Sequence, residues 1–366
     1  MSIKATSVVL KNAPLKDVNY EWDQSDSTFE IKTQNLDAST LKDGEVLAKI
    51  LYISNDPTQR TWMQKDQDVS RAYAPPIRDG DAVSSLALAE VVHSKSSKYK
   101  VGEIINARLA WADYVITDES NIFNAIDKSQ QLPLEFYLSC LGMTSLTAYF
   151  GLVDAGKLKP TPEGEKGPII AISAASGATG SIAVQLAKNV FGASKVIGIS
   201  GSEEKAKWVE SIGADKCFNY HDPNYKQQLA DYLQGEFIDV YFDNVGGEIL
   251  SFLLTKVKKF GRVIACGSIA GYNDKSKSYV TSWTEIIVQS LRVQGFIVTN
   301  YSDRFPEAFQ VLGDAVKSGK INAGDSYHLE DISNETNVEL KLKQIPQIWK
   351  QLFGDSKPNA KLITKL

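Results

Sequence analysis

Residues 169–201 read IIAISAASGATGSIAVQLAKNVFGASKVIGISG, and this stretch decides the fold. Its opening apolar run gives way to small residues, turns through Gly177 and Gly180, and continues as an apolar segment that ends at Gly192. A second β-branched run follows at 196–199. Strand, tight turn, helix and strand in this order predict a βαβ unit.

The turn in this unit has the spacing Ala174-x-x-Gly177-x-x-Gly180, which is the spacing of the dinucleotide-binding fingerprint with alanine at the first glycine position. Small residues there let backbone N–H groups and the positive end of the helix approach a pyrophosphate. A helix that packs tightly on a sheet also needs small residues, so the turn alone leaves a structural alternative open. We take Ala174, Gly177 and Gly180 as candidate cofactor contacts.

Length and composition limit the class of protein. A chain of 366 residues favours two domains, and a net charge of −4 gives no basic surface for nucleic acid or an anionic membrane. No run reaches the roughly 18 apolar residues of a membrane span, and the N-terminus lacks a signal-peptide pattern. Three cysteines, odd in number and far apart, indicate a reducing compartment. We therefore expect a cytoplasmic protein with no nucleic-acid or membrane partner.

The order of apolar runs predicts the domain organisation. Short runs separated by Gly, Pro and Asp predict a β-barrel-like domain over roughly the first 130 residues, and the alternation of strand and helix from Gly167 predicts a parallel, doubly wound sheet. A helical stretch is expected from near Leu134 to Gly156, and the tail 359–366 reads as a closing strand. The strands expected in the first domain are 5–11, 28–33, 46–54, 84–93 and 104–116. The elements expected in the second are 168–173, 181–191, 195–200, 203–212, 216–218, 223–234, 237–242, 247–259 and 261–266.

With these stretches in view, the chain resembles a zinc-independent medium-chain dehydrogenase/reductase. Within that branch it is similar to the NADPH-dependent alkenal and enone reductases, the group of the prostaglandin reductases and plant double-bond reductases. The resemblance rests on LGMTSLTAYFGL (141–152), AASGATGS (174–181), GSEEKAKWV (201–209), FNY (218–220), YFDNVGGE (241–248), KKFGRVIACGSIAGYN (258–273) and LRVQGFIV (291–298).

The resemblance implies an α/β fold in which a Rossmann sheet interrupts a GroES-like β-barrel domain. We expect the first part of the barrel domain over 1–135, the Rossmann domain over 136–312, and a return to the barrel over 313–366. It also implies a homodimer and a small-molecule electrophilic carbonyl substrate.

The choice of cofactor depends on the end of the second Rossmann strand, which reads Ser200-Gly201-Ser202 and has no carboxylate to hold a ribose 2′-hydroxyl. Glu203 and Glu204 follow in the first turn of a helix for which Ser202 is the expected N-cap, and acids are expected there because of the helix dipole. Lys205 can reach a 2′-phosphate as a point charge, with a solvated helix lysine as the alternative. By resemblance, Lys205 and Tyr220 contact that phosphate, which favours NADPH.

Two loops are expected beside the nicotinamide, because ligands of open α/β sheets lie beyond the carboxyl ends of the strands. They are Asp243-Asn244-Val245-Gly246-Gly247 and the segment 266–273. An ordinary turn rich in Asn and Gly, and a small buried residue at Cys266, are the structural alternatives. With the resemblance, the further expected cofactor contacts are Ala178, Thr179, Ser200, Gly201, Asn244, Cys266, Ser268, Ile269, Tyr272, Phe296 and Val298.

Tyr272 and Tyr52 are the candidate catalytic residues, with Tyr272 preferred. Hydride transfer to the β-carbon of an enal builds negative charge on the carbonyl oxygen, and a tyrosine hydroxyl or the cofactor's ribose hydroxyl can stabilise it. A tyrosine that only packs over the cleft is the alternative for both residues. Because the α-carbon can take its proton from solvent, a dedicated general acid is not needed.

No metal is expected, since the chain has no Cys-x-x-Cys pair and its three histidines are scattered. The chain departs from the family at Thr58, where an aromatic residue is usual, at Ala87 and Ala89, and at Ala360. These departures leave the substrate open. A quinone reductase and a non-catalytic NADPH-binding module remain as alternative functions.

Overall fold

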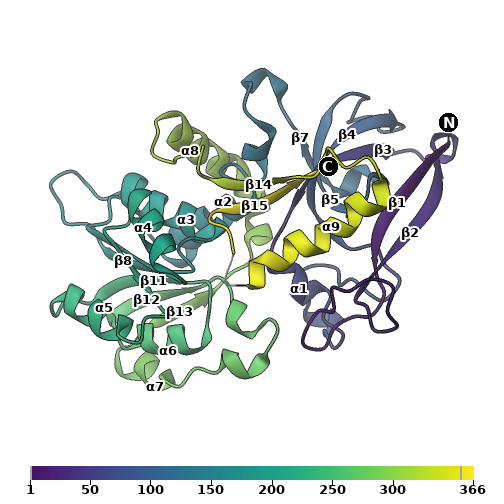
Figure 1. The fold of residues 1–366 in the computed structure, drawn as a ribbon. Coiled ribbons are helices and arrows are strands. Elements are labelled where there is room, and N and C mark those ends of the chain that lie inside the picture. The colour runs from purple at the N-terminus through teal and green to yellow at the C-terminus, as the bar shows by residue number, and fades with distance from the viewer. Residues whose placement is uncertain (1, 355–356) are drawn as a thin grey trace. The chain divides into compact units, whose positions relative to one another are not determined.

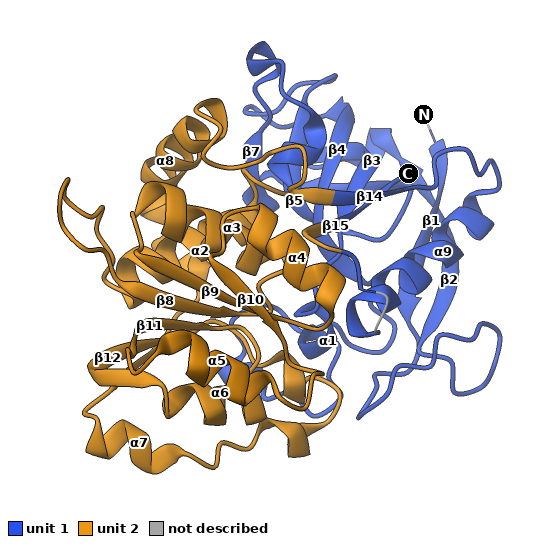
Figure 2. Cartoon of the chain, turned by 60° about the vertical axis from the view of Figure 1, so that its left-hand side comes forward, with its two compact units in different colours: residues 1–138, 328–358, 362–366 blue, residues 139–327, 359–361 orange. Residues whose placement is uncertain are grey.

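The computed structural model describes residues 2–354 and 357–366 and divides into two compact units (Figure 2). Unit 1 comprises Met1–Leu138, His328–Pro358 and Leu362–Leu366, and unit 2 comprises Ser139–Tyr327 and Asn359–Lys361. The sequence-based boundary at residue 312 falls inside helix α8 (Phe305–Lys317), which packs on α2 (Met143–Phe150) of the same unit. Ala360 also belongs to unit 2, and its N–H donates to Ser176 O over 2.8 Å.

Unit 1 is built on a sheet with the strand order β14-β15-β3-β4-β5-β7, and β6 also pairs with β3. A separate two-stranded ribbon, β1–β2, completes its strands. Helix α9 (Val338–Lys350) adds Trp349, which is fully buried against Trp111 with ring centroids 6.1 Å apart. The strands are β1 (Ser2–Leu10), β2 (Phe29–Asp37), β3 (Glu45–Ser54), β4 (Ser84–Ser94), β5 (Ile104–Ala110), β6 (Tyr114–Asp118), β7 (Ile122–Ala125), β14 (Tyr327–Asp331) and β15 (Lys361–Lys365).

The strand expected over 104–116 is wrong as a single element, because the chain leaves the sheet at Trp111. β5 pairs with β4 and β6 pairs with β3, so the chain must cross from one partner to another between them. Trp111 makes the crossing: its N–H donates to Val83 O over 2.7 Å and its side chain is fully buried in the core. Continuous β propensity hid this break, which tertiary pairing imposes.

Unit 2 contains a six-stranded sheet with the order β10-β9-β8-β11-β12-β13, and its pairs are parallel. This is the doubly wound order, in which the chain reverses direction between β8 and β11. Helices α3 and α4 cover one face of the sheet and α5 and α6 the other (Figure 1). The strands are β8 (Ile169–Ser173), β9 (Lys195–Ser200), β10 (Lys216–Asn219), β11 (Ile238–Asp243), β12 (Val257–Ala265) and β13 (Arg292–Gly295).

Most helices of unit 2 follow the sequence pattern. Helix α3 (Ala178–Gln185) passes into a π-helical turn at Leu186–Val190, and the segment ends at Gly192 in a left-handed conformation, as predicted. The remaining helices are α4 (Glu203–Ser211), α5 (Tyr225–Leu233), α6 (Gly247–Leu254) and α7 (Trp283–Val288); the short α1 (Gln59–Trp62) lies in unit 1.

Two helical expectations are corrected. The helix expected over 247–259 stops at Leu254, because Val257 pairs with Ile238 and begins β12. The stretch from Leu134 is a short 3₁₀ turn (Leu134–Tyr137) followed separately by α2 and a π turn (Gly151–Ala155).

Candidate functional site

The candidate site is the edge of the unit 2 sheet at which β8, β9, β11 and β12 all end. Parallel strands bring their carboxyl ends together, and the crevice at the reversal between β8 and β11 is where such sheets bind ligands. Each of these strands is followed by a loop that the sequence marked for the cofactor.

The loop after β8 fits a phosphate group. Ala174 takes the left-handed conformation, with φ +47°, and its carbonyl accepts the Gly177 N–H over 2.9 Å. The bond from Ser181 N to Gly177 O begins α3, so the N–H groups of residues 178–180 precede it in the first turn, where an α-helix provides no acceptor. A Cβ on Gly180 would lie 2.3 Å from Ala174 O, so this glycine is required by packing.

The corner after β9 carries the residues that the sequence analysis predicts to distinguish NADPH from NADH. Ser202 caps α4 and accepts the Lys205 N–H over 3.2 Å, which is the N-cap that the sequence indicated. Lys205 is half-buried, and the ring of Tyr220 lies over Gly201, 3.4 Å from the position of a Cβ there. The Tyr220 ring also contacts His221, with centroids 4.2 Å apart. The Tyr220 ring therefore covers a half-buried glycine corner, and Lys205 follows this corner in the first turn of α4.

The loop after β11 is held by Asp243, which the sequence analysis did not select. Its carboxylate is buried and accepts from Tyr241 OH over 2.7 Å, from Val245 N over 3.1 Å and from Gly246 N over 3.0 Å. Ser173 Oγ on β8 lies 3.2 Å away. Burial raises the pKa of Asp243 above its ordinary value, while these donors act in the opposite direction. Its only sequence signal was an acid at the end of an apolar strand.

Hydrogen bonds tie the neighbouring loops to this carboxylate loop. Asn244 donates from Nδ2 to Ser173 O over 2.7 Å and from its backbone N–H to Ser173 Oγ over 2.9 Å. From the loop after β12, the N–H groups of Cys266 and Gly267 donate to Asp243 O over 2.9 and 3.1 Å, and Ile269 N donates to Asn244 O over 3.4 Å. Hydrogen bonds thus connect the loops at the ends of β8, β11 and β12 into one group.

Tyr272 lies within this hydrogen-bonded group of loops. It follows the 3₁₀ turn Ile269–Gly271, and its hydroxyl is 3.6 Å from the position of a Cβ on Gly267, so the ring folds back along its own loop. Ser268 Oγ lies against Gly246, 2.8 Å from a Cβ position there. Burial raises the pKa of Cys266 to about 12, so this thiol stays protonated at neutral pH and fits the structural alternative.

The remaining predicted residues lie elsewhere. Phe296 follows the edge strand β13 and packs on Gly151 at the end of α2, 2.9 Å from a Cβ position there, and Val298 begins a 3₁₀ turn (Val298–Arg304). Tyr52 belongs to unit 1, on β3 opposite Leu88. The structure therefore joins five of the predicted residues through one network: Asn244, Cys266, Ser268, Ile269 and Tyr272. Among the residues that the structure describes, Phe296 has no such link.

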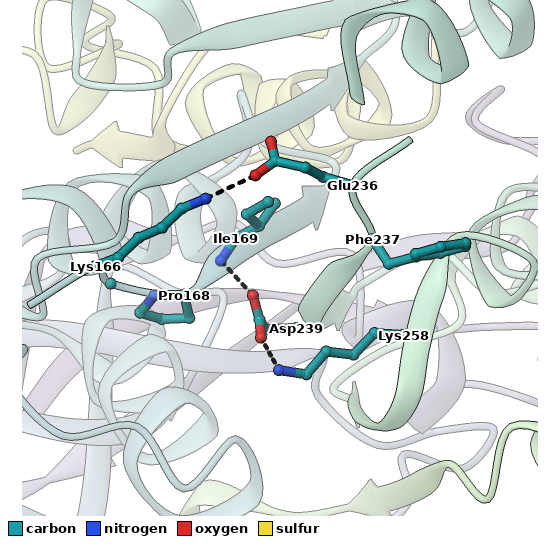
Figure 3. A pocket seen from close by; sticks show the side chains of 8 residues that line it. Lys166, Pro168, Ile169, Glu236, Phe237, Asp239 and Lys258 are labelled. Atoms are coloured by element: carbon teal, nitrogen blue, oxygen red, sulfur yellow. Dashed lines mark hydrogen bonds and ion pairs between the residues drawn. The ribbon is translucent and has the colours of Figure 1, made fainter. Parts of the chain in front are cut away.

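The opposite edge of the same sheet holds a pocket of a different kind, shown in Figure 3. Lys166 pairs with Glu236 over 2.7 Å, and Asp239 pairs with Lys258 and accepts the Ile169 N–H over 2.7 Å. It lies at the amino ends of β8 and β11, where loops carry none of the predicted site residues. Its charges are paired with one another.

Within residues 2–354 and 357–366, no group of three or more His, Cys, Asp or Glu side chains gathers in a way that could hold a metal ion. None of the helices in that same part of the chain has the length and apolar character needed to cross a bilayer.

Comparison with known proteins gives two matching family models and relatives of full length. A model described as "Zinc-binding dehydrogenase" matches residues 178–314, and one described as "N-terminal domain of oxidoreductase" matches residues 19–125. The chain is 37% identical to the "Uncharacterized membrane protein YML131W" of Saccharomyces cerevisiae, over 100% of this chain and 99% of that protein. It is 32% identical to the NADP(+)-dependent 2-alkenal reductase of Nicotiana tabacum, over 79% and 80% of the two chains. The crystal structure of CurA from Vibrio vulnificus in complex with NADPH superimposes with a TM-score of 0.81 at 26% identity, over 98% of both chains.

Proposed function

Because the chain belongs to the zinc-independent branch of the medium-chain dehydrogenase/reductase family, in the group of the alkenal and enone reductases, we propose that it uses NADPH to reduce the C=C bond of α,β-unsaturated aldehydes and ketones. The observation that carries the proposal is the bonded carboxyl edge of the unit 2 sheet. There the Asp243 network holds Asn244 and the Tyr272 loop beside the helix-capping turn 174–180. The relatives support the same chemistry, since one is named for alkenals and one was crystallised with NADPH.

The cofactor is proposed to bind along the four loops that follow β8, β9, β11 and β12. The N–H groups of residues 178–180 suit its pyrophosphate, and Lys205 and Tyr220 suit its 2′-phosphate. Two features support NADPH over NADH: the position after Ile199 is Ser200, which has no carboxylate, and Glu203 and Glu204 are exposed. Asn244 and the 266–269 segment remain for the nicotinamide end.

NADPH, when bound, supplies the hydride for the reaction. The chain's own task is to hold the substrate carbonyl and to stabilise the charge that grows on its oxygen. We assign this hydrogen bond to the Tyr272 hydroxyl, with Tyr52 as the second candidate. A preorganised donor of this kind contributes about 10²–10³-fold in rate. The proton that completes the α-carbon comes from solvent.

A side-by-side assay tests this function. We expect the purified protein to oxidise NADPH with 2-alkenals and 2-alkenones, with kcat/KM at least about tenfold higher than with quinones of similar size. A preference for quinones would favour the quinone reductase alternative. NADPH binding without turnover of any of the three would favour a non-catalytic module.

We also propose that the chain forms a homodimer through the outer edge of the unit 2 sheet. β13 ends the strand order, and Trp283, Ile287 and Val288 on α7 are exposed by 55–69%, with Val293 on β13 exposed by 44%. An apolar patch beside a terminal strand is typical of a surface that a second copy covers. Light scattering should give about twice the mass of the chain, and Val293→Asp should reduce it to one copy. A cytoplasmic location is proposed because the three cysteines are odd in number and far apart along the chain, which fits a reducing compartment.

A further inference from the structure

One face of the unit 1 sheet lies outside the main core cluster of that unit and carries polar side chains beside the buried Leu88. Tyr52 on β3 lies opposite Leu88 on β4, which in turn lies opposite Asn106 on β5. Directly paired residues point to the same side of a sheet, and Arg108 follows Asn106 by two residues on that side. The alternate residues, among them Ala87 and Ala107, belong to the buried core on the other side. Arg108 and the candidate residue Tyr52 therefore share one face.

Several contacts hold the Arg108 guanidinium in place. Its Nε donates to Ser84 Oγ over 3.0 Å, and its Nη2 donates to Pro75 O over 2.9 Å. Its central carbon lies 4.4 Å from the centroid of the Trp62 ring. Trp62 is itself fixed, because its Nε1 donates to Tyr73 OH over 2.8 Å. An arginine held at two polar points and stacked on an aromatic ring is oriented before any ligand arrives.

This arginine lacks a counter-charge. In residues 2–354 and 357–366, no carboxylate forms an ion pair with Arg108; its contacts are the two neutral oxygens and the aromatic ring. Burial lowers the pKa of Arg108, although the guanidinium remains protonated at any physiological pH. A desolvated charge without a partner is unfavourable, so a bound anion would be stabilising at this position.

The geometry also leaves donors for that anion. A guanidinium has five N–H groups, and the two hydrogen bonds of Arg108 use one on Nε and one on Nη2. The remaining N–H groups lie on Nη1 and Nη2. Together they can donate two parallel hydrogen bonds to a carboxylate. Asn106 Oδ1, on the same face, is likewise buried with no hydrogen-bond partner in the described part of the chain.

We propose that Arg108 binds a carboxylate carried by the substrate, at the end remote from the reacting double bond. The inference rests on the proposed reductase function, because that function is the reason for placing the reacting end of the substrate near Tyr52. By strand spacing, Asn106 lies about 10 Å from Tyr52 across two strands, and Arg108 lies about 7 Å further along β5. The carboxylate and the enal are therefore separate groups, joined by a chain of several carbon atoms.

The rings around Arg108 suit such a chain. Thr58 stands where the related reductases commonly have an aromatic residue, and the Tyr73 hydroxyl is hydrogen-bonded to Thr58 as well as to Trp62. Tyr73, which comes from a later segment, thus places an aromatic ring beside Thr58. Trp62 and Tyr73 give an apolar wall beside the guanidinium, which is the surface that a hydrocarbon chain with a charged end requires.

The test compares an alkenal that bears a carboxylate at the far end of a saturated chain with its methyl ester. We expect the wild-type protein to prefer the acid, and Arg108→Gln to lower the acid-to-ester ratio of kcat/KM by about tenfold or more, since a hydrogen bond to a charged group is lost. The ester alone should change by less than about threefold. Arg78→Gln is the matched control, because in the part of the chain that the structure describes the Arg78 guanidinium donates only to the backbone carbonyl of Gln67, at 3.4 Å. The acid-to-ester ratio of this variant should equal that of the wild type.

Binding gives a second readout that does not need turnover. Calorimetry should find octanoate bound at least about tenfold more tightly by the wild type than by Arg108→Gln, with octanol showing no difference. A wild type with no preference for the acid, or equal octanoate binding by both proteins, overturns the inference and leaves the reductase function intact. Failure to reduce either alkenal would instead count against the proposed function, and octanoate binding would then decide the role of Arg108.

Discussion

Strand β11 carries an aspartate near each of its ends, and the two are held in opposite ways. Asp239 at the amino end is partly exposed, pairs with Lys258 and accepts the N–H of Ile169 at the start of β8. Asp243 at the carboxyl end is buried and has only neutral donors, one of them Ser173 at the end of β8. At one edge the aspartate that links the two strands is also held by an ion pair, and at the other edge it is a buried carboxylate held by neutral donors.

The difference explains why one edge is the candidate site. Exposed ion pairs are screened by water and typically contribute about 0.2–1 kcal/mol, so the amino edge in Figure 3 can exchange partners at little cost. A buried carboxylate with several donors fixes the loops that supply them, because each donor left unpaired costs about 1–3 kcal/mol. Rigid loops are what a cofactor site requires.

The largest expected effect comes from removing each aspartate in turn. Asp243→Ala leaves Tyr241 OH and two backbone N–H groups without their acceptor, and we expect it to lower the free energy of unfolding by about 3 kcal/mol. Asp239→Ala should cost about 1 kcal/mol, since it loses an exposed pair and one backbone contact. Urea unfolding of the two variants measures both values. Equal losses would mean that the two edges do not differ as described.

The second prediction concerns chemistry at the carboxyl edge. Tyr272→Phe keeps the ring and removes the hydroxyl, so kcat should fall by about 10–10³-fold while the Kd for NADPH stays within about twofold. Single-turnover hydride transfer to an enal, compared with Tyr52→Phe and the double variant, measures the step itself. Unchanged transfer in Tyr272→Phe would return this residue to a packing role and leave the cofactor ribose as the donor.

The third prediction contrasts Lys205, in the first turn of α4 after β9, with Lys195 at the start of β9. Lys205→Ala should raise the KM for NADPH by about tenfold and leave that for NADH nearly unchanged, because only NADPH carries the 2′-phosphate. Lys195, at the amino end, pairs with Glu236, and Lys195→Ala should leave both values within about twofold. A similar loss for both cofactors in Lys205→Ala would contradict the assignment of this corner.

The smallest effect is a pH dependence of opposite sign at the two edges. The pKa of Asp243 is raised by burial, so the folded chain takes up its proton first and gains stability relative to Asp243→Asn as the pH falls toward about 4. The pKa of Glu236 is lowered to about 2 by hydrogen bonds from Lys166 and Lys195, so its stabilising contribution is lost as the pH falls from about 4.5 to 2.

Unfolding free energies of the wild type, Asp243→Asn and Glu236→Gln across this range give both signs. The gap between the wild type and Asp243→Asn should widen on acidification, by about 1.4 kcal/mol for each unit by which the pKa is raised. The difference in unfolding free energy between the wild type and Glu236→Gln should become smaller as the pH falls. Parallel curves would show that the two carboxylates titrate alike.

The sequence predicted the parallel, doubly wound sheet of unit 2 well, because alternating strands and helices with short connections admit few other arrangements. It also located the turn at Ala174 and the cap at Ser202, which depend on neighbouring residues. It missed Asp243, whose role appears only when Tyr241, Val245 and a serine 70 residues earlier converge on it.

The same limit applies in unit 1. Arg108 gave no signal in the sequence, because its partners Trp62 and Ser84 lie 46 and 24 residues away along the chain. The break at Trp111 was hidden by continuous β propensity for a related reason. Long-range pairing decides both features, and a local pattern cannot contain it.

The place of the last strand bears on how the protein is made. β15 lies between β14 and β3, and α9 contributes Leu342, Ile345 and Trp349 to the core that the first 122 residues begin. During synthesis from the N-terminus, the six strands of the unit 2 sheet have all emerged by residue 295, whereas unit 1 must wait for the final residues. Until then, the half of β3 that pairs with β15 exposes an open edge and an unfilled core, so the nascent chain is a natural client for chaperones. Protease digestion of chains stalled before residue 338 should cut unit 1 and spare β8–β13.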